Sequence, residues 1–246
     1  MQAPWRQNLA RRKSEAFPIV QKAINDLRTT NAPNDGLMNH YVNGDFVTSN
    51  DDEMLSILVG LLMGAQDNIA AATAWAIAFL AHYPALQDQI RSEIMAVGSD
   101  ASDLDQCARL KSTIYEVLRM RPPAPANQPR VLLQEVEIAG HKLPKGTHLF
   151  NSFYNMHHDG TVFTNPEAFD PDRFMDNSLA RSPSFTPFGH GPRNCVAQGM
   201  AIQQLLAIVA GTLRGHRIVA QHPALPDIQQ KPMLVPSPFR IVLEPV

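Results

Sequence analysis

Residues 188–195 read Phe-Gly-His-Gly-Pro-Arg-Asn-Cys, and this stretch decides more about the fold than any other part of the chain. Its glycines and proline predict a tight loop, and the apolar residues 196–213 that follow predict a helix. Cys195 therefore stands before a helix N-terminus, whose partial positive charge favours an ionised sulfur. A thiolate in this place can bind a metal, and Arg193 beside it can pair with an anionic group of a cofactor.

The composition is that of a globular protein. The chain has 246 residues, 44% of them hydrophobic and 18% charged, with a formal net charge of −2. This length buries a sizeable core, and the near-neutral charge gives no footprint for a nucleic-acid partner. Two cysteines, Cys107 and Cys195, make no disulfide framework and favour a reducing, cytosol-facing compartment.

The first residues carry basic side chains at Arg6, Arg11, Arg12 and Lys13. These bases leave no apolar run of the kind that a secretory leader needs. We expect them to line a solvated helix face and not a binding patch.

Residues 54–81 are apolar enough to be mistaken for a membrane span, and Gly60 and Gly64 have the spacing of a helix-dimer motif in lipid. Residues 66–68, Gln-Asp-Asn, interrupt this segment at its centre, where a charge is costly in a bilayer. Neither flanking run reaches about 18 apolar residues. We therefore expect a buried helix and no transmembrane segment in this chain.

The rest of the chain reads as helices followed by short strands, without internal repeats or a domain linker. The sequence predicts one mainly α-helical domain with small β-sheets over residues 1–246. Residues 31–46 and 155–194 are expected to be mostly irregular. The predicted helices are 5–28 (one helix, or a pair broken at Pro18), 49–83, 84–97, 110–120 and 196–213; the predicted strands are 130–138, 141–143, 147–153, 216–220 and 239–243.

The loop at 188–195 closely resembles the cysteine-ligand loop of the cytochrome P450 family. The positions that match are Phe188, Gly189, Gly191, Arg193 and Cys195. The resemblance implies that Cys195 is the axial ligand of haem iron, that Phe188 packs beside the sulfur, and that Arg193 meets a haem propionate. Ala197 stands where the family more often has glycine, and its small side chain still allows close approach of the porphyrin.

A second set of residues matches the same family in order and spacing. Glu116 and Arg119 are three residues apart and share a helix face, which alone is typical of solvated surface pairs. The later segment 171–174, Pro-Asp-Arg-Phe, gives this pair more weight. The resemblance implies that Arg173 joins Glu116 and Arg119 in a buried triad that braces the haem-side core. Their expected role is structural and not chemical.

Two further motifs have weaker assignments. Arg130 follows a proline-rich run, where the resemblance implies a further arginine that pairs with a propionate. His157 and His158 could suggest metal ligands, but we favour a structural role for them.

The long predicted helix contains the segment 64–68, Gly-Ala-Gln-Asp-Asn, which resembles the oxygen-binding bend of the family. The resemblance implies that an acid and a following threonine deliver protons there. Asp67 is present, but Asn68 replaces the threonine and lacks a hydroxyl. Some relatives with asparagine here remain hydroxylases, and others rearrange peroxides. Asp67 and Asn68 are thus the candidate catalytic residues, and both reactions stay open.

The resemblance extends from about residue 5 to the end of the chain and corresponds to the C-terminal part of the family's full length. We therefore expect a haem-thiolate domain that is truncated at its N-terminus. The segment without a counterpart supplies, in the family, a membrane anchor where one exists, which allows an association with the endoplasmic reticulum for a longer form.

The leading hypothesis is a haem-thiolate monooxygenase that inserts one oxygen atom from O₂ into a small apolar substrate. An external reductase would donate the electrons, because no flavin or nicotinamide fingerprint occurs in the sequence. The alternatives are a haem-thiolate peroxide isomerase or dehydratase, and a fragment without catalytic activity. Two weaker hypotheses are a cysteine hydrolase using Cys195 and His190, and a copper or non-haem iron site of His157, His158 and Cys195.

Overall fold

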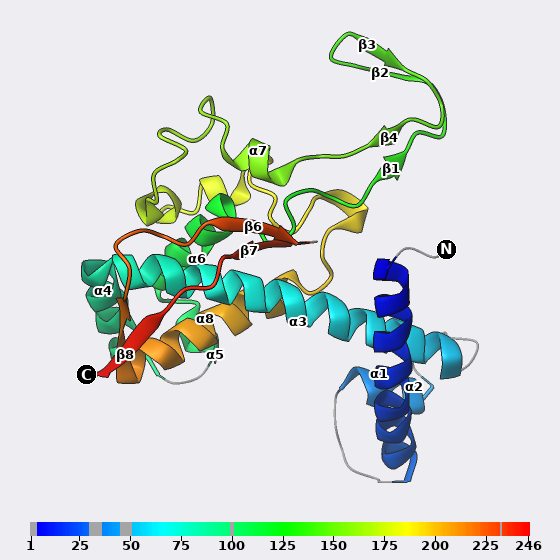
Figure 1. The fold of residues 1–246 in the computed structure, drawn as a ribbon, viewed down its shortest axis with the longest axis horizontal. Helices are drawn as coiled ribbons and strands as arrows, with labels where there is room; N and C mark the ends of the chain where they lie inside the picture. Colours follow the sequence, from blue (N-terminus) through cyan, green and yellow to red (C-terminus); the bar gives the residue numbers. More distant parts are fainter. Residues whose placement is uncertain (1–3, 30–35, 45–50, 99–100, 232) are drawn as a thin grey trace. The chain divides into compact units, whose positions relative to one another are not determined.

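The computed structural model describes residues 4–29, 36–44, 51–98, 101–231 and 233–246 (Figure 1). The chain forms two compact units, Met1–Asp67 and Asn68–Val246, and each is described here by itself. The boundary falls inside the long helix α3 (Asp51–His82).

The first unit contains α1 (Pro4–Thr29), α2 (Leu37–Val42) and the beginning of α3. The apolar side chains of α1 recur at helical spacing, so they lie on one face and pack against α3. This small core consists of Val20, Ile24, Met54, Leu55, Leu58 and Val59, all buried. Of the two alternatives for residues 5–28, the structure has the single helix, which continues through Pro18. One expectation needs correction: α2 forms within residues expected to be irregular.

The second unit has a larger core built around the C-terminal half of α3. The helices packed there are α4 (Pro84–Ala96), α5 (Ala101–Leu104), α6 (Ala108–Met120) and α8 (Gln198–Gly215) (Figure 1). Trp75 and Phe79 of α3 are fully buried among apolar side chains of these helices. The prediction of a mainly helical protein with small sheets is therefore confirmed.

The strands of the described chain form two-stranded antiparallel sheets. The first two pairs are β1 (Arg130–Val131) with β4 (His148–Leu149), and β2 (Val136–Ile138) with β3 (His141–Leu143). The other two are β5 (His216–Ala220) with β8 (Ile241–Pro245), and β6 (Ile228–Lys231) with β7 (Met233–Pro236).

Several predicted strands differ from the observed ones. The strand predicted at 130–138 is two strands, β1 and β2, and residues 132–135 belong to neither. The strand predicted at 147–153 ends at Leu149, and Phe153 begins helix α7 (Phe153–His157). The hydroxyl of Ser152 caps this helix by accepting a hydrogen bond from the Asn155 backbone N–H at 3.2 Å. No strand was predicted in the proline-rich segment that forms β6 and β7.

By length and composition alone, helix α3 is long and apolar enough to cross a membrane. In the second unit, however, its side chains Trp75, Ala76 and Phe79 are completely buried in the protein core. A core helix of this kind has the same composition as a membrane span. The expected absence of a transmembrane segment stays a prediction.

A buried glutamine connects helix α4 to strand β5. The amide of Gln87, which is completely buried, donates to the carbonyl oxygens of Leu80 at 2.8 Å and Ile218 at 2.7 Å. Its Oε1 accepts from the Ile218 backbone N–H at 2.9 Å. Both backbone polar groups of Ile218 thus find partners on Gln87, on the side of β5 away from β8.

We expect Gln87→Leu to lower the free energy of unfolding by about 2–4 kcal/mol, because it leaves the buried N–H and C=O of Ile218 without partners. Gln89→Leu, on the exposed side of the same helix, should change it by no more than about 0.5 kcal/mol. Urea denaturation of both variants measures the difference. Equal effects of the two substitutions would contradict a structural role for Gln87.

Candidate functional site

The loop before Cys195 is closed by its own backbone. The N–H of Cys195 donates to the carbonyl oxygen of Phe188 at 2.8 Å. Gly189 and Gly191 have φ angles of +82° and +75°, in the left-handed region that favours glycine. A Cβ at Gly189 would also lie 3.7 Å from the Cα of Asn194. These two glycines therefore determine the path of the loop that presents the cysteine.

The loop places one side chain against the protein core and another at the surface. Phe188 is half-buried and packs against the core of the second unit. Cys195 is exposed as a free thiol, three residues before α8 begins. Its carbonyl oxygen accepts a hydrogen bond from the N–H of Gln198 at 3.4 Å, which joins the loop to the first turn of the helix. The sequence prediction of a cysteine directly before a helix agrees with this geometry.

Two apolar side chains close to the thiol in sequence are exposed. Val196 is 91% exposed and Met200, in the first turns of α8, is 53% exposed. Apolar side chains that are exposed beside a potential metal ligand suit a flat apolar group that would cover them.

Two cations could neutralise an acidic group of a cofactor. Arg130, on β1, and Arg193, in the loop, are both exposed, and neither has an ion pair or a side-chain hydrogen bond within the described chain. A soft thiolate ligand, an apolar surface and unpaired guanidinium groups are together the chemistry that haem requires. The residues present therefore fit this cofactor.

The two candidate catalytic residues lie side by side in the middle of α3. Asp67 and Asn68 are both half-buried, and the helix is continuous from Asp51 to His82 across them. Asp67 is the last residue of the first unit and Asn68 the first of the second. Their assignment to the oxygen side of a haem stays a prediction.

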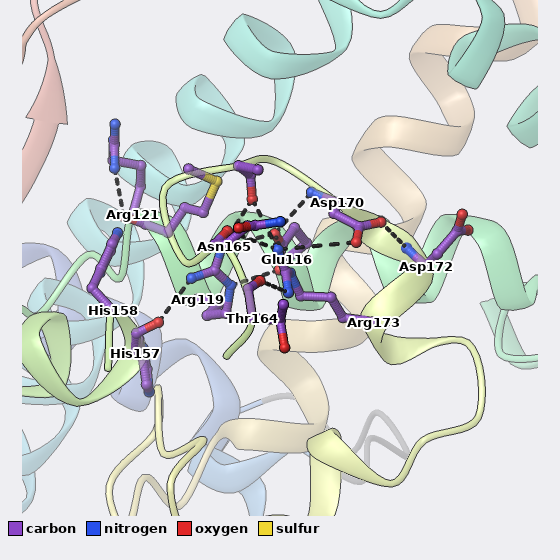
Figure 2. A network of polar contacts seen from close by, with 12 residues as sticks. Glu116, Arg119, Arg121, His157, His158, Thr164, Asn165, Asp170, Asp172 and Arg173 are labelled. Carbon is purple, nitrogen blue, oxygen red and sulfur yellow. Dashed lines mark hydrogen bonds and ion pairs between the residues drawn. The ribbon is translucent and has the colours of Figure 1, made fainter. Parts of the chain in front are cut away.

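Glu116, Arg119 and Arg173 form a network of ion pairs, which Figure 2 shows from close by. The side chains of Glu116 and Arg119 are completely buried. Arg119 donates from Nε to Oε2 of Glu116 at 2.7 Å and from Nη2 to Oε1 at 2.8 Å. Arg173 donates to Oε1 at 3.3 Å, and so does the backbone N–H of Asp170 at 2.9 Å. The carboxylate thus has two cations and a backbone donor around it.

The same arginines also hold irregular segments in place (Figure 2). Arg119 donates to the carbonyl oxygens of His157 at 2.8 Å and Ala168 at 3.2 Å. Arg173 donates to those of Thr164 and Asn165. Helix α6 is thereby connected to α7, to residues 164–168 and to the 3₁₀ helix η1 (Pro171–Phe174). Sequence reasoning found the three charged residues but missed these carbonyl partners, because backbone acceptors leave no mark in the sequence.

His157 is a buried residue for which the sequence favoured a structural role but did not show the partner. Its Nε2 accepts a hydrogen bond from the backbone N–H of Thr186 at 3.0 Å, which requires a neutral ring. Burial, together with the positive charge of Arg119, lowers the pKa of His157 to about 4. His157 therefore supports the loop that leads to residue 188 as a neutral hydrogen-bond acceptor.

The two weaker hypotheses find no support in the described residues. Within them, no group of three His, Cys, Asp or Glu side chains could hold a metal ion, so His157, His158 and Cys195 do not form such a site. In this same part of the chain, His190 makes no hydrogen bond to Cys195, as a cysteine hydrolase would require.

We expect Glu116→Gln to lower the free energy of unfolding by about 3–5 kcal/mol, because it leaves two arginines near a buried site without their counter-charge. Glu137→Gln, an exposed residue of β2, is the matched control and should change it by less than about 0.5 kcal/mol. Chemical denaturation followed by circular dichroism measures both. A Glu116→Gln protein as stable as the control would rule out the network as a structural support.

His157 also predicts how stability depends on pH. Above pH 6.5 its ring is neutral in both states; as the pH falls toward about 4, only the unfolded chain binds the proton. The free energy of unfolding should therefore fall by roughly 3 kcal/mol over this range on account of this group. His157→Gln, which keeps an acceptor for Thr186, should remove most of this fall, whereas His141→Gln should not. Unfolding at several pH values tests this, and identical pH profiles would contradict it.

Comparison with known proteins agrees with this geometry. The family model "Cytochrome P450" matches residues 9–244. Cytochrome P450 4A12B of Mus musculus is 34% identical over 199 residues, which cover 79% of this chain and 37% of that protein. Steroid 17-alpha-hydroxylase/17,20 lyase of Oryzias latipes is 34% identical over 206 residues, which cover 79% of this chain and 38% of that protein.

The chain thus spans less than two fifths of the length of these curated relatives. The match includes the cysteine loop, the buried Glu116 network and α3 in one continuous family model. On this basis the chain belongs to the cytochrome P450 family.

Proposed function

We propose that this chain provides the thiolate side of a haem-dependent monooxygenase, with Cys195 as the axial ligand of the iron. The observation that carries the proposal is an exposed thiol at the end of a loop whose path two left-handed glycines determine. Haem, when bound, would supply the activation of O₂ and the transfer of one oxygen atom to the substrate.

The protein's own residues would hold and orient this group. The thiolate of Cys195 would bind the metal, and the exposed apolar side chains of Val196 and Met200 would pack against the flat face of the ring. Arg130 and Arg193 would each pair with a carboxylate at the edge of the ring. The hydrogen bond from the Cys195 N–H to the Phe188 carbonyl oxygen would hold the backbone from which the sulfur projects.

Glu116, Arg119 and Arg173 would serve the site indirectly. Their network positions the segments between α7 and η1, and His157 links the same region to Thr186, two residues before Phe188. The cysteine loop thus rests on a polar network in which Glu116, Arg119 and His157 are completely buried. We propose that residues 1–246 act together as one haem-thiolate domain.

Asp67 and Asn68 would act on the oxygen side of the site. Asp67 would move protons, and the Asn68 amide would hold a water molecule by hydrogen bonds. The apolar composition of α3 supports a small apolar substrate. The sequence carries no flavin or nicotinamide fingerprint, which supports a separate reductase as the electron donor. The name of one relative, a steroid hydroxylase, is compatible with a substrate of this class.

Asn68 also supports a second candidate function, the isomerisation or dehydration of a peroxide. This reaction needs no external electrons, whereas monooxygenation does. Turnover of an organic hydroperoxide without a reductase, and no hydroxylation with one, would favour the second function over the first.

The first test is the absorption spectrum of the haem-supplemented, dithionite-reduced protein under carbon monoxide. We expect a strongly red-shifted Soret band that Cys195→Ala abolishes, because only a thiolate ligand produces this shift. Cys107→Ala, which changes the buried cysteine, is the control and should keep the band.

Failure to bind haem, or a band that Cys195→Ala leaves unchanged, would contradict the proposal. The chain would then be a member of the family without catalytic activity on its own.

A further inference from the structure

The basic residues near the start of the chain have no part in the proposed haem site. Residues 11–14 read Arg-Arg-Lys-Ser, and Ser14 is the only serine or threonine with arginines both two and three positions before it. Protein kinases with acidic substrate grooves recognise arginines placed in this way before a serine, because the charge pattern of the substrate is a main source of kinase specificity.

Ser14 lies on the solvated side of α1. It is exposed, and so are Arg11 and Pro18, one helical turn before and after it. Phe17, Val20 and Ile24 of the same helix belong to the core of the first unit. Arg11, Ser14 and Pro18 recur at spacings of three and four residues and are all exposed, so Ser14 lies on a solvent-facing strip of α1.

The backbone at Ser14 is also a weak point of the helix. Pro18 stands inside α1 and has no N–H, so the carbonyl oxygen of Ser14 lacks its usual partner four residues later. Separately, the Ser14 hydroxyl donates a hydrogen bond to the Arg11 carbonyl oxygen at 2.7 Å. Helices open most readily where a ladder hydrogen bond is missing, and kinases bind their substrates in an extended form. The local opening that phosphorylation requires is therefore least costly here.

We propose that Ser14 is a phosphorylation site for a protein kinase that recognises arginines before its acceptor, with ATP as the phosphoryl donor. A bond forms between Ser14 Oγ and the γ-phosphorus, and the bond from that phosphorus to the β-bridging oxygen breaks to release ADP. The hydroxyl proton passes to the catalytic aspartate of the kinase.

The modification lowers the local positive charge. Residues 11–13 carry three positive charges, and a phosphate adds about −1.5 to −2 at residue 14. The phosphate can pair with Arg11 at the i−3 position, in competition with the weak contact of 4.0 Å between Arg11 and Glu15. Phosphorylation thus lowers the net charge of residues 11–14 from +3 to about +1 to +1.5.

The test is incubation of the full chain with the catalytic subunit of the cyclic-AMP-dependent protein kinase and Mg–ATP, followed by intact mass measurement and peptide mapping. We expect one phosphoryl group per chain on Ser14, none in Ser14→Ala, and at least a tenfold slower reaction for Arg11→Gln. Ser56→Ala, an exposed serine of α3 that follows acidic residues, should react like the unmodified chain.

Three results would overturn the proposal. They are incorporation that persists in Ser14→Ala, incorporation that Arg11→Gln leaves unchanged, and no reaction of the full chain when a free peptide of residues 8–20 is phosphorylated. The last result would show that α1 does not open to present the serine.

Discussion

The structure of the second unit depends on one buried carboxylate. Glu116 accepts hydrogen bonds from two arginines and from a backbone N–H in a site without solvent access. Buried charges are tolerated only when they are paired and fully hydrogen-bonded. Here the other N–H groups of the two arginines donate hydrogen bonds to backbone carbonyl oxygens of the neighbouring segments. A region with little regular secondary structure, residues 158–194, thereby obtains a defined path. The polar network stabilises this region, whereas apolar packing stabilises the helices.

The thiol at Cys195 is useful only because this path is defined. A cysteine on a mobile loop would present its sulfur in many orientations, whereas this loop is closed by a backbone hydrogen bond and two left-handed glycines. Phe188 packs against the core on one side, and Cys195 faces solvent on the other. Within eight residues the loop thus combines a side chain that packs against the core with an exposed cysteine, the proposed ligand.

Much of the fold followed from local patterns. The apolar periodicity of α3, α4, α6 and α8 located these helices within a few residues, since packing of an amphipathic face decides a long helix. Short strands were less predictable. β6 and β7 pair within a proline-rich segment, and Phe153 begins a helix because Ser152 caps it, although the preceding residues resemble a strand. Pairing and capping of this kind depend on a few hydrogen bonds that a periodic sequence pattern does not predict.

The sequence by itself determined the residues of the proposed site: a cysteine in a Gly-Pro loop before a helix, arginines that can meet an anion, and the Glu116, Arg119 and Arg173 set in family order. These features are visible because they require particular residue types at particular spacings. The tertiary structure alone decided which backbone carbonyls Arg119 and Arg173 contact, that His157 is a neutral acceptor, and that Gln87 satisfies the backbone of Ile218. Burial and backbone partners arise from contacts between segments far apart in the chain, and only folding brings those segments together.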